Sequence, residues 1–348
     1  MIEKDKLKQM ALALGADDVG IGSLDRFDGA PPEMDPRHIA PNAKSIIGLL
    51  FRIPRGYIRG IEEGTHFMQY PSMGYGGINE NYAPQVLYEL GKYIEDQKYE
   101  AIVYRNTGGR STLSDMTGKS YKDFEQSPEM HQKEKTPGNR RGVVARNTKG
   151  LAAPDVQFHF RIAGFICGLG EIGYSKMLLN DKFGPLNRQA FILTDAEIEP
   201  DPMYERHLCN DCKACVRHCP GNCISGHEQV KINVAGNDIH WGELAEWSCF
   251  AYYVGANRSS NPFLEKDAFK HLPDGDKIIR GEFTVSSKTQ PEIAKVLDAA
   301  HMQEIGGYGT PKCGGCLRAC YDTLEKRGVL KNKFKNKFRT KKPWKLEI

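Results

Sequence analysis

The stretch Cys209-x-x-Cys212-x-x-Cys215-x-x-x-Cys219-Pro220 organises the chain. Four cysteines at this spacing, with a proline directly after the last, form the pattern in which thiolates hold [4Fe–4S] clusters. The first three thiolates of such a run bind one cluster, and the fourth reaches a neighbouring cluster. Zinc prefers paired C-x-x-C knuckles, which differ from a four-cysteine run ending in proline. The stretch therefore predicts an iron–sulfur domain.

A second group of cysteines completes the ligand count. Cys313, Cys316 and Cys320 follow downstream, and Cys249 lies alone between the two groups. Two [4Fe–4S] clusters need eight thiolates, which these residues supply together with the first run. The interleaved pattern of two-cluster ferredoxins assigns one cluster to Cys209, Cys212, Cys215 and Cys320, and the other to Cys219, Cys249, Cys313 and Cys316.

Two cysteines are left over, Cys167 and Cys223. Free cysteines are among the most buried residue types and pack as small apolar side chains, which is the favoured interpretation of both. Cys223 remains an alternative to one of the assigned ligands.

The size and composition of the chain suit a soluble protein of two domains. Its 348 residues are enough for a full hydrophobic core. No stretch approaches the roughly 20 apolar residues of a membrane helix. The first residues have neither an apolar signal region nor a twin-arginine pair, which predicts a cytoplasmic protein. In that compartment ten cysteines are better explained as metal ligands than as disulfides.

Helices and strands are expected to alternate through the first 200 residues, which predicts an α/β domain. Helices are expected over residues 5–14, 82–97 and 155–167, and strands over 19–21, 45–53, 101–104 and 191–194. Residues 56–80 are rich in Gly, Tyr and Met and are expected to form a loop over a site. Residues 107–150 form a polar insert that would be a lid or a disordered segment. We expect domains at 1–200 and 201–325.

A basic tail, residues 326–348, follows the cluster domain. Its residues 326–345 carry ten basic side chains and no acid, against a net charge of +4 for the whole chain. Such a run would bind RNA, an anionic membrane surface or an acidic electron donor. The alternative is a solvated tail that lies over the cluster domain, which we favour because charge runs are usually solvated.

Several short motifs precede the cysteine run in a fixed order. They are Gly168-Leu169-Gly170-Glu171-Ile172-Gly173, Phe183-Gly184-Pro185-Leu186-Asn187-Arg188 and Thr194-Asp195. This order resembles the reductive dehalogenase family, and the resemblance covers roughly residues 10–325. Related epoxyqueuosine reductases share the cysteine layout, Gly-Leu-Gly and the Pro-x-Ala-Lys-Ser motif, which is Pro41-Asn42-Ala43-Lys44-Ser45 here. The chain looks closer to the dehalogenases.

The resemblance implies the fold and the cofactors. It implies an α+β/α/β protein, in which a nitroreductase-like corrinoid-binding domain precedes a ferredoxin-like domain with two [4Fe–4S] clusters. Cobalamin would lie beside the nearer cluster, with no protein ligand to cobalt. The predicted corrinoid contacts are Gly168, Gly170, Glu171, Gly173 and Tyr174, although the glycines would also serve as a plain helix-to-loop break.

The resemblance also implies catalytic residues. A reduced corrinoid would cleave a carbon–heteroatom bond, and the carbanion-like centre then needs a proton. The predicted proton donor is Tyr82, with Tyr75 as an alternative, while Arg188 would support it and Asn106 would line the pocket. A phenol with an ordinary pKa near 10 is a poor acid at neutral pH unless a cation lowers that pKa. The alternative is that Tyr82 is a core residue and Arg188 a surface ion-pair residue.

Three functions remain open at this stage. The first is a corrinoid-dependent iron–sulfur reductase with a small-molecule substrate and a ferredoxin- or flavodoxin-type electron donor. The second is an epoxyqueuosine reductase-like enzyme whose basic tail binds tRNA, which would make binding sensitive to salt. The third is a non-catalytic electron-transfer protein that serves or reactivates a corrinoid partner.

Overall fold

The computed structural model describes residues 2–31, 34–63, 69–106, 159–259, 261, 264–286, 289–300 and 313–338. The polar insert predicted at 107–150 and residues 339–348 of the basic tail lie outside the described residues. No helix within the described ranges is long and apolar enough to cross a membrane.

A four-stranded sheet forms the centre of the fold. Its order is β1 (Asp18–Ser23), β2 (Ser45–Arg52), β6 (Asn187–Thr194) and β3 (Ala101–Tyr104). Each neighbouring pair in this sheet is antiparallel. The predicted mixture of helices and strands is confirmed, but antiparallel pairing makes the arrangement α+β rather than a parallel α/β sheet. Alternation along the chain predicted the elements without predicting their direction.

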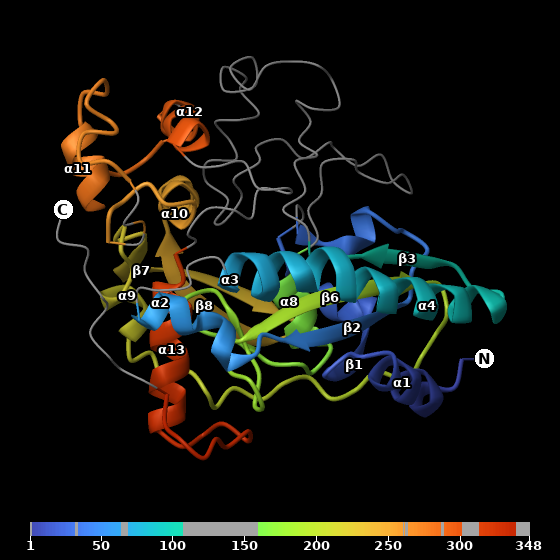
Figure 1. The fold of residues 1–348 in the computed structure, drawn as a ribbon. Coiled ribbons are helices and arrows are strands. Elements are labelled where there is room, and N and C mark those ends of the chain that lie inside the picture. Colours follow the sequence, from blue (N-terminus) through green and yellow to red (C-terminus); the bar gives the residue numbers. More distant parts are fainter. Residues whose placement is uncertain are drawn as a thin grey trace, which may run out of the picture.

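Layers of helix and hairpin bury both faces of this sheet. Strand β2 is apolar along almost its whole length because successive side chains enter opposite cores. Ile47 and Leu49 pack with α1 (Lys4–Ala13) and α4 (Ala83–Asp96). Ile46 and Leu50 pack on the other face with α8 (Phe160–Ile166) and the hairpin of β7 (Ile224–Val234) and β8 (Asn237–Leu244). Figure 1 shows α4 lying across the sheet.

The expected loop at residues 56–80 is wrong where the structure describes it. The chain is helical there, in η4 (Arg55–Ile58), α2 (Arg59–Glu63), α3 (Gln69–Pro71) and the π-helix η5 (Ser72–Tyr82), which continues into α4. Three glycines lower the helix propensity of η5, but Ile58, Tyr70 and Ile78 are buried in the core under the sheet. Burial of these side chains overrides propensity. Long π-helices are rare, and π-helical turns often mark functional sites.

The cysteine-bearing elements gather at one end of the molecule. They include α9 (Ala214–Arg217), α10 (Glu246–Tyr253) and α13 (Gly315–Lys326), which lie on the same side of the view in Figure 1. Helices α11 (Gly275–Arg280) and α12 (Gln290–Ala300) lie beyond α10. The short strands β4 (Glu171–Ile172) and β5 (Leu178–Leu179), and the 3-10 turns η1 (Leu24–Phe27) and η3 (Pro36–His38), complete the described elements.

Side chains from both sides of residue 200 share cores. Leu317, Tyr321 and Leu324 of α13 pack in the same core as α1 and α4. Trp241 of β8 packs with α8 on the opposite face of the sheet. The proposed division at residue 200 therefore separates motifs along the chain, while the hydrophobic core runs across it.

Candidate functional site

The first group of cysteines lies together. Burial raises the pKa of the Cys320 thiol well above its ordinary value, and the nearby thiols of Cys209, Cys215 and Cys212 add to that rise. Burial, followed by Cys209 and Cys212, raises the pKa of Cys215 to about 12. Cys320 comes from α13, and the other three come from the loop that leads into and through α9. The structure thus brings together the four thiols that the interleaved pattern assigned to one cluster.

The second group of cysteines is also assembled from distant segments. Burial raises the pKa of the Cys316 thiol, with further contributions from Cys313, Cys249 and Cys219. The pKa of Cys313 rises to about 12, mainly through burial, and Cys219 and Cys249 also raise it. These four thiols are the predicted ligands of the other cluster. A buried thiol is hard to ionise without a cation, so each set is suited to hold a metal centre.

The backbone of the first loop is shaped for its thiols. Asp211 and Lys213 adopt left-handed conformations, with φ of 54° and 55°, which turn the chain between successive cysteines. The Tyr174 N–H donates to Cys209 Sγ at 3.3 Å. A Cβ on Gly315 would lie 2.3 Å from the His218 carbonyl oxygen, so α13 can begin against this loop because it begins with glycine. Hydrogen bonds to sulfur and burial are known determinants of cluster potential.

The thiols of each group are not gathered around one point. Among the described residues, no three His, Cys, Asp or Glu side chains converge closely enough to ligate one metal ion. Four thiolates around a [4Fe–4S] cluster each bind a different iron, so they need not converge on one point.

The two remaining cysteines differ from each other. Cys167 is buried under the sheet and burial raises the pKa of its thiol, which confirms the expected small core residue. Cys223 is buried beside Cys219, and its N–H donates to Cys219 Sγ at 3.2 Å. The Cys223 thiol donates to the Gly221 carbonyl at 3.3 Å. Interaction with the Cys223 side chain is the largest cause that lowers the pKa of Cys219, to about 6. Cys223 therefore supports a predicted ligand as well as filling space.

Glu171 anchors the start of the cysteine run. Its carboxylate is buried and accepts hydrogen bonds from the N–H groups of His207 at 2.6 Å, Leu208 at 2.9 Å and Cys209 at 2.5 Å. A carboxylate that receives three backbone donors fixes the loop strongly. The sequence analysis predicted that Glu171 contacts a corrinoid. Its local motif did not indicate that its carboxylate would accept hydrogen bonds from the start of the cysteine run.

The glycines of the same segment pack against the protein itself. Cβ atoms on Gly168 and Gly170 would each lie 2.3 Å from a backbone oxygen, of Pro202 and Leu179 respectively. A Cβ on Gly173 would lie 2.8 Å from the Leu179 side chain. Tyr174 is buried among the first cysteines, and its hydroxyl donates to the Ser225 carbonyl at 3.0 Å. The predicted contacts of this segment with a corrinoid thus remain a prediction, since the segment is occupied by the chain's own atoms.

A buried ion pair links that segment to the second cysteine group. Lys176 Nζ lies 3.0 Å from Glu246 Oε1, and both side chains are nearly buried. Lys176 lies in the turn between β4 and β5, and Glu246 begins α10, the helix that carries Cys249. The pair therefore connects the β4–β5 turn to the start of α10.

The predicted arginine, Arg188, contacts Tyr75, which was the alternative to the predicted Tyr82. Arg188 Cζ lies 4.0 Å from the centre of the Tyr75 ring, a stacking contact of cation and ring. Tyr82 ends the π-helix with 51% of its surface exposed. Arg188 Nε also donates to Asn79 Oδ1 at 3.1 Å. The sequence did not single out Asn79, because its importance depends on the π-helical turn that carries both it and Tyr75.

Two further tyrosines connect this group to the second cysteines. Burial raises the pKa of both Tyr70 and Tyr253, and the Arg188 guanidinium opposes the rise in each. The Cys313 thiol also raises the pKa of both phenols. The Tyr253 ring centre lies 6.0 Å from that of Tyr75, and the Tyr253 carbonyl accepts a hydrogen bond from the Cys313 N–H at 3.0 Å.

Asn106 lies at the edge of this neighbourhood. It follows β3, which pairs with β6, the strand that carries Arg188. The preceding residue, Arg105, forms an ion pair with Glu80 of the π-helix. Asn106 is half-buried, and the described structure gives it no direct contact with Arg188. Its predicted role in lining the pocket stays a prediction.

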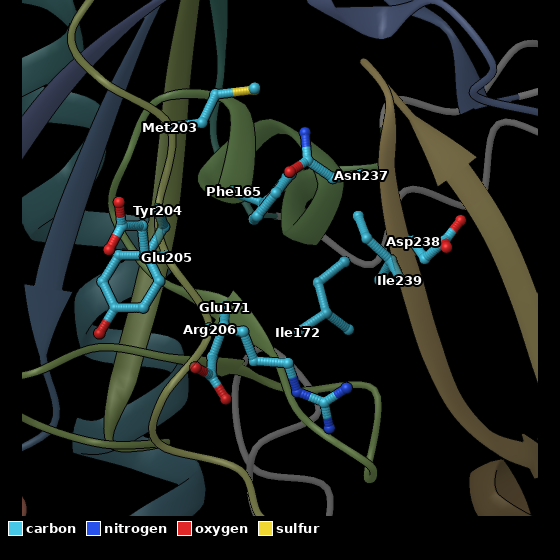
Figure 2. Close-up of a pocket in the computed structure, with 10 residues that line it drawn as sticks. All are labelled: Phe165, Glu171, Ile172, Met203, Tyr204, Glu205, Arg206, Asn237, Asp238 and Ile239. Atoms are coloured by element: carbon cyan, nitrogen blue, oxygen red, sulfur yellow. The ribbon is translucent and has the colours of Figure 1, made fainter.

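A separate cavity of about 500 Å³ is lined in part by Glu171. Figure 2 shows it between the segment Met203–Arg206, helix α8 and the β7–β8 hairpin. Phe165, Ile172 and Ile239 give it apolar walls. Arg206 at its rim pairs with Asp211 of the first cysteine loop at 2.6 Å. None of the predicted catalytic residues lines this cavity.

Comparison with known proteins supports the resemblance. No family model matches the chain. The tetrachloroethene reductive dehalogenase of Dehalobacter restrictus is 31% identical over 146 residues, 40% of this chain and 24% of the relative. Among solved structures, a catabolic reductive dehalogenase bound to 3-bromo-4-hydroxybenzoic acid matches at 16% identity and a TM-score of 0.48, covering 88% of this chain and 39% of its own. The epoxyqueuosine reductase from Streptococcus thermophilus matches at 16% identity and a TM-score of 0.38, covering 65% and 54%.

The predicted resemblance to the reductive dehalogenases is therefore confirmed by a curated relative. The match spans about a quarter of that relative's length, at 24%. The activity of the whole relative is accordingly carried over to this chain only as a proposal.

Proposed function

We propose that the chain is a corrinoid-dependent iron–sulfur reductase that cleaves a carbon–heteroatom bond in a small molecule, as a reductive dehalogenase does. The curated relative named tetrachloroethene reductive dehalogenase supports this reaction class. The two groups of cysteines support two [4Fe–4S] clusters as its electron carriers.

The direction of electron flow follows from exposure. Cys212 of the first group is exposed, whereas Cys316 of the second is half-buried and lies near Tyr70. Electrons from a ferredoxin- or flavodoxin-type donor would enter at the first group and pass to the second. One helix, α13, contributes Cys316 and Cys320, one to each group, which keeps the two clusters close.

The proton would come from Tyr75 rather than Tyr82. Tyr75 is stacked on Arg188 and borders Tyr253, while Tyr82 is largely exposed. A positioned general acid of this type contributes on the order of 10²–10⁴ in rate. A corrinoid, when bound, would supply the electron pair that breaks the bond. The glycines of the segment Gly168–Tyr174 pack against the chain's own atoms. The residues of this chain would therefore deliver electrons and the proton, and we propose no corrinoid contact for them.

One observation carries the proposal more than any other. The acid–cation pair of Tyr75 and Arg188 sits next to Tyr253, and the backbone of Tyr253 is hydrogen-bonded to Cys313. The proposed electron-delivering centre and the proposed proton donor would therefore lie side by side, as a reductive bond cleavage requires.

The first experiment is anaerobic purification from cobalamin-supplied cells, with iron, sulfide and cobalt counted per chain. We expect about eight irons, the content of two [4Fe–4S] clusters, and one cobalt. Turnover of halogenated and epoxide substrates would then be assayed with a chemical reductant. Eight irons without cobalt, even after reconstitution with cobalamin, would contradict the proposal and leave a non-catalytic electron-transfer protein.

Matched cysteine variants serve as the control for the iron count. Cys249→Ala removes a predicted ligand and should lower the count by about the four irons of one cluster. Cys167→Ala removes a buried cysteine of the sheet core and should leave the count unchanged.

A further inference from the structure

The described part of the basic tail is anchored to the rest of the protein. Arg55 Cζ lies 3.7 Å from the centre of the Phe334 ring, and Arg55 also donates to the Asn336 carbonyl at 3.0 Å. The Phe338 N–H donates to Glu325 Oε2 at 2.5 Å, and Glu325 pairs with Arg55 at 2.6 Å. Figure 1 shows this segment in red where it follows α13. These contacts hold the segment beside the end of that helix.

Four exposed cations lie on this segment and directly before it. They are Arg327, Lys333, Lys335 and Lys337, which we call the basic strip. Arg327 Nη1 donates to the Leu208 carbonyl at 2.5 Å, in the residue before the cysteine run. The basic strip therefore begins at the loop that carries the first cysteine group.

The acids beside the basic strip already have partners. Asp322 pairs with Lys326 at 2.6 Å, and Asp181 pairs with Lys331 at 2.6 Å. Glu325 is used by the anchoring contacts described above. Within the described part of the chain, no carboxylate forms an ion pair with any of the four cations of the basic strip.

Other exposed lysines of the fold are compensated by an acid three residues away. Lys277 lies 2.8 Å from Asp274, and Lys295 lies 2.8 Å from Glu292. Residues 326–338 contain no acid, so this local pairing is impossible for the basic strip. Unbalanced charge of this kind raises the association rate of a partner of opposite sign by roughly 10- to 10³-fold. The basic strip thus suits an acidic partner.

The first cysteine group is close to this surface. Glu325, which anchors the segment, follows Cys320 by five residues of α13, about 7.5 Å along the helix. Arg327 is bonded to the residue before Cys209, and Cys212 of the same loop is exposed. A partner on the basic strip would therefore lie near the group at which electrons are proposed to enter.

The aromatic rings of the segment are used in packing. Arg55 covers one face of the Phe334 ring, and Phe338 packs edge to face on Tyr321, with ring centres 5.3 Å apart. Proteins that bind single-stranded nucleic acid combine positive charge with aromatic faces on which bases stack. The basic strip offers the charge while its rings contact the protein, which favours a protein partner over RNA.

We infer that the basic strip is the docking surface for a small acidic protein that carries one electron. The carrier would be oxidised by one electron and the cluster proposed at the first cysteine group would be reduced by one, with no bond made or broken. This inference deepens the proposed function and rests on it for the cluster that receives the electron. It names the place where the donor binds and the charge that selects it.

Electron transfer from a ferredoxin tests the docking surface apart from turnover. The full chain, purified anaerobically with its clusters, would be mixed without substrate with a reduced, acidic plant-type [2Fe–2S] ferredoxin in a stopped-flow instrument. At an ionic strength of about 0.1 M the Debye length is about 10 Å, so only charges close to the docked partner act on it. We expect the combined Lys333→Gln, Lys335→Gln and Lys337→Gln variant to lose about tenfold in the second-order rate constant. The loss should vanish at about 1 M salt, where the Debye length is roughly 3 Å.

The matched control removes three exposed lysines that have acid partners. Lys270→Gln, Lys277→Gln and Lys295→Gln together change the net charge by the same amount outside the basic strip. The rate constant of this control should stay within about threefold of the unaltered chain. Iron content and reduction by photoreduced deazaflavin, a small neutral reductant, check that both variants keep working clusters. Calorimetry with the oxidised ferredoxin measures docking separately from electron transfer.

The outcomes separate the docking surface from the reaction. Equal losses in the two combined variants, or a ferredoxin that neither binds nor reduces the chain, would overturn the docking surface. Loss of tRNA stem-loop binding in the basic-strip variant, with an unchanged rate constant for ferredoxin, would identify an RNA surface and overturn the inference too. Turnover with a chemical reductant despite either result would leave the proposed function intact. Reduction that depends on the basic strip, without turnover of any substrate, would support the docking surface and contradict the reductase.

Discussion

Glu171 influences the first cysteine group without being a ligand. Three consecutive backbone N–H groups, ending with that of Cys209, point at its buried carboxylate. Such a contact is worth more than an ordinary hydrogen bond because the acceptor is charged and shielded from water. The residue therefore shapes the loop before any iron arrives.

Replacing this carboxylate tests its role in the loop. Glu171→Gln turns one acceptor oxygen into an NH₂ group that faces an N–H donor, which leaves buried donors unsatisfied. We expect the iron count per chain to fall toward the four irons of a single cluster, with the second group retained. Glu246→Gln, which alters a buried acid on α10, should not reduce the first cluster, and an unchanged count in Glu171→Gln would contradict this role.

The proposed role of Tyr75 as the proton donor can be tested by removing a single hydroxyl group. Tyr75→Phe keeps the ring on Arg188 and removes only the hydroxyl, so both clusters should form normally. We expect turnover to fall by about 10²- to 10⁴-fold, the contribution of a general acid. Tyr82→Phe is the matched control in the same π-helix and should change turnover little. Single-turnover rates at saturating substrate would measure both, and equal losses would rule out the choice of Tyr75.

The grouping of the cysteines could be predicted from the sequence, whereas the choice between the two tyrosines could not. Iron chemistry demands thiolates at short, fixed spacings, and those spacings are visible in the chain itself. The orientation of Tyr75 and Asn79 depends on π-helical geometry, in which each turn holds an extra residue compared with an α-helix. No local pattern in the glycine-rich segment specified that geometry, so Tyr82 and Tyr75 could not be separated.

At the level of elements, the strands and main helices followed from periodicity and the hairpin did not. The apolar run of β2 predicted its burial on both faces. The β7–β8 hairpin was not predicted, because its burial pattern is irregular and a register shift interrupts the pairing between Ile224 and Gln229. Its inward side chains, such as Trp241, are recognisable only once α8 provides a surface for them.

Asp201, in the segment between β6 and the cysteine run, binds this segment to α1 and β1. Its carboxylate lies 2.8 Å from the ammonium groups of both Lys4 and Lys8, and it accepts from the Ile21 N–H at 2.9 Å. Burial alone would raise the pKa of Asp201, but these three hydrogen bonds together lower it below its ordinary value. The carboxylate is therefore more acidic in the folded chain than in the unfolded chain.

This shift predicts a pH-dependent stability. A folded pKa below the unfolded pKa of about 3.9 gives stability that is complete above the unfolded value and is lost as pH falls through the folded one. Asp201→Asn should lower the free energy of unfolding at pH 6 by about 1–2 kcal/mol, and the difference should shrink toward pH 3. Urea unfolding across that range measures it. Asp276→Asn, at an exposed pair on α11, should show little effect at either pH, and a constant deficit in Asp201→Asn would contradict the assignment.

Across the whole molecule, the two cysteine groups join segments that meet only in the folded chain. Residues of α13 pack in the core of the sheet and also supply Cys316 and Cys320. We therefore expect formation of the proposed clusters to be linked to docking of this helix, since a metal site absent from the unfolded chain adds its binding free energy to folding. The antiparallel sheet and this shared core were beyond what motif order could predict, because motif order carries no information on strand direction.

Removal of iron should accordingly loosen the C-terminal helix. We expect the chelated protein to unfold at a lower urea concentration and to be cleaved first next to α13 in limited proteolysis. Reconstitution with iron and sulfide should restore both properties, which separates loss of the clusters from damage by the chelator. An iron-free protein with the original urea midpoint would show that the core alone docks the helix.

Cys316 and Cys320 lie on consecutive turns of α13, which would affect electron transfer between the two proposed clusters. Four residues of α-helix advance about 6 Å, so the pitch of α13 would set the distance between the two proposed clusters at this point. Loops elsewhere can lengthen without altering that distance. A single residue inserted between the two cysteines would turn one of them to another side of the helix, away from its proposed cluster.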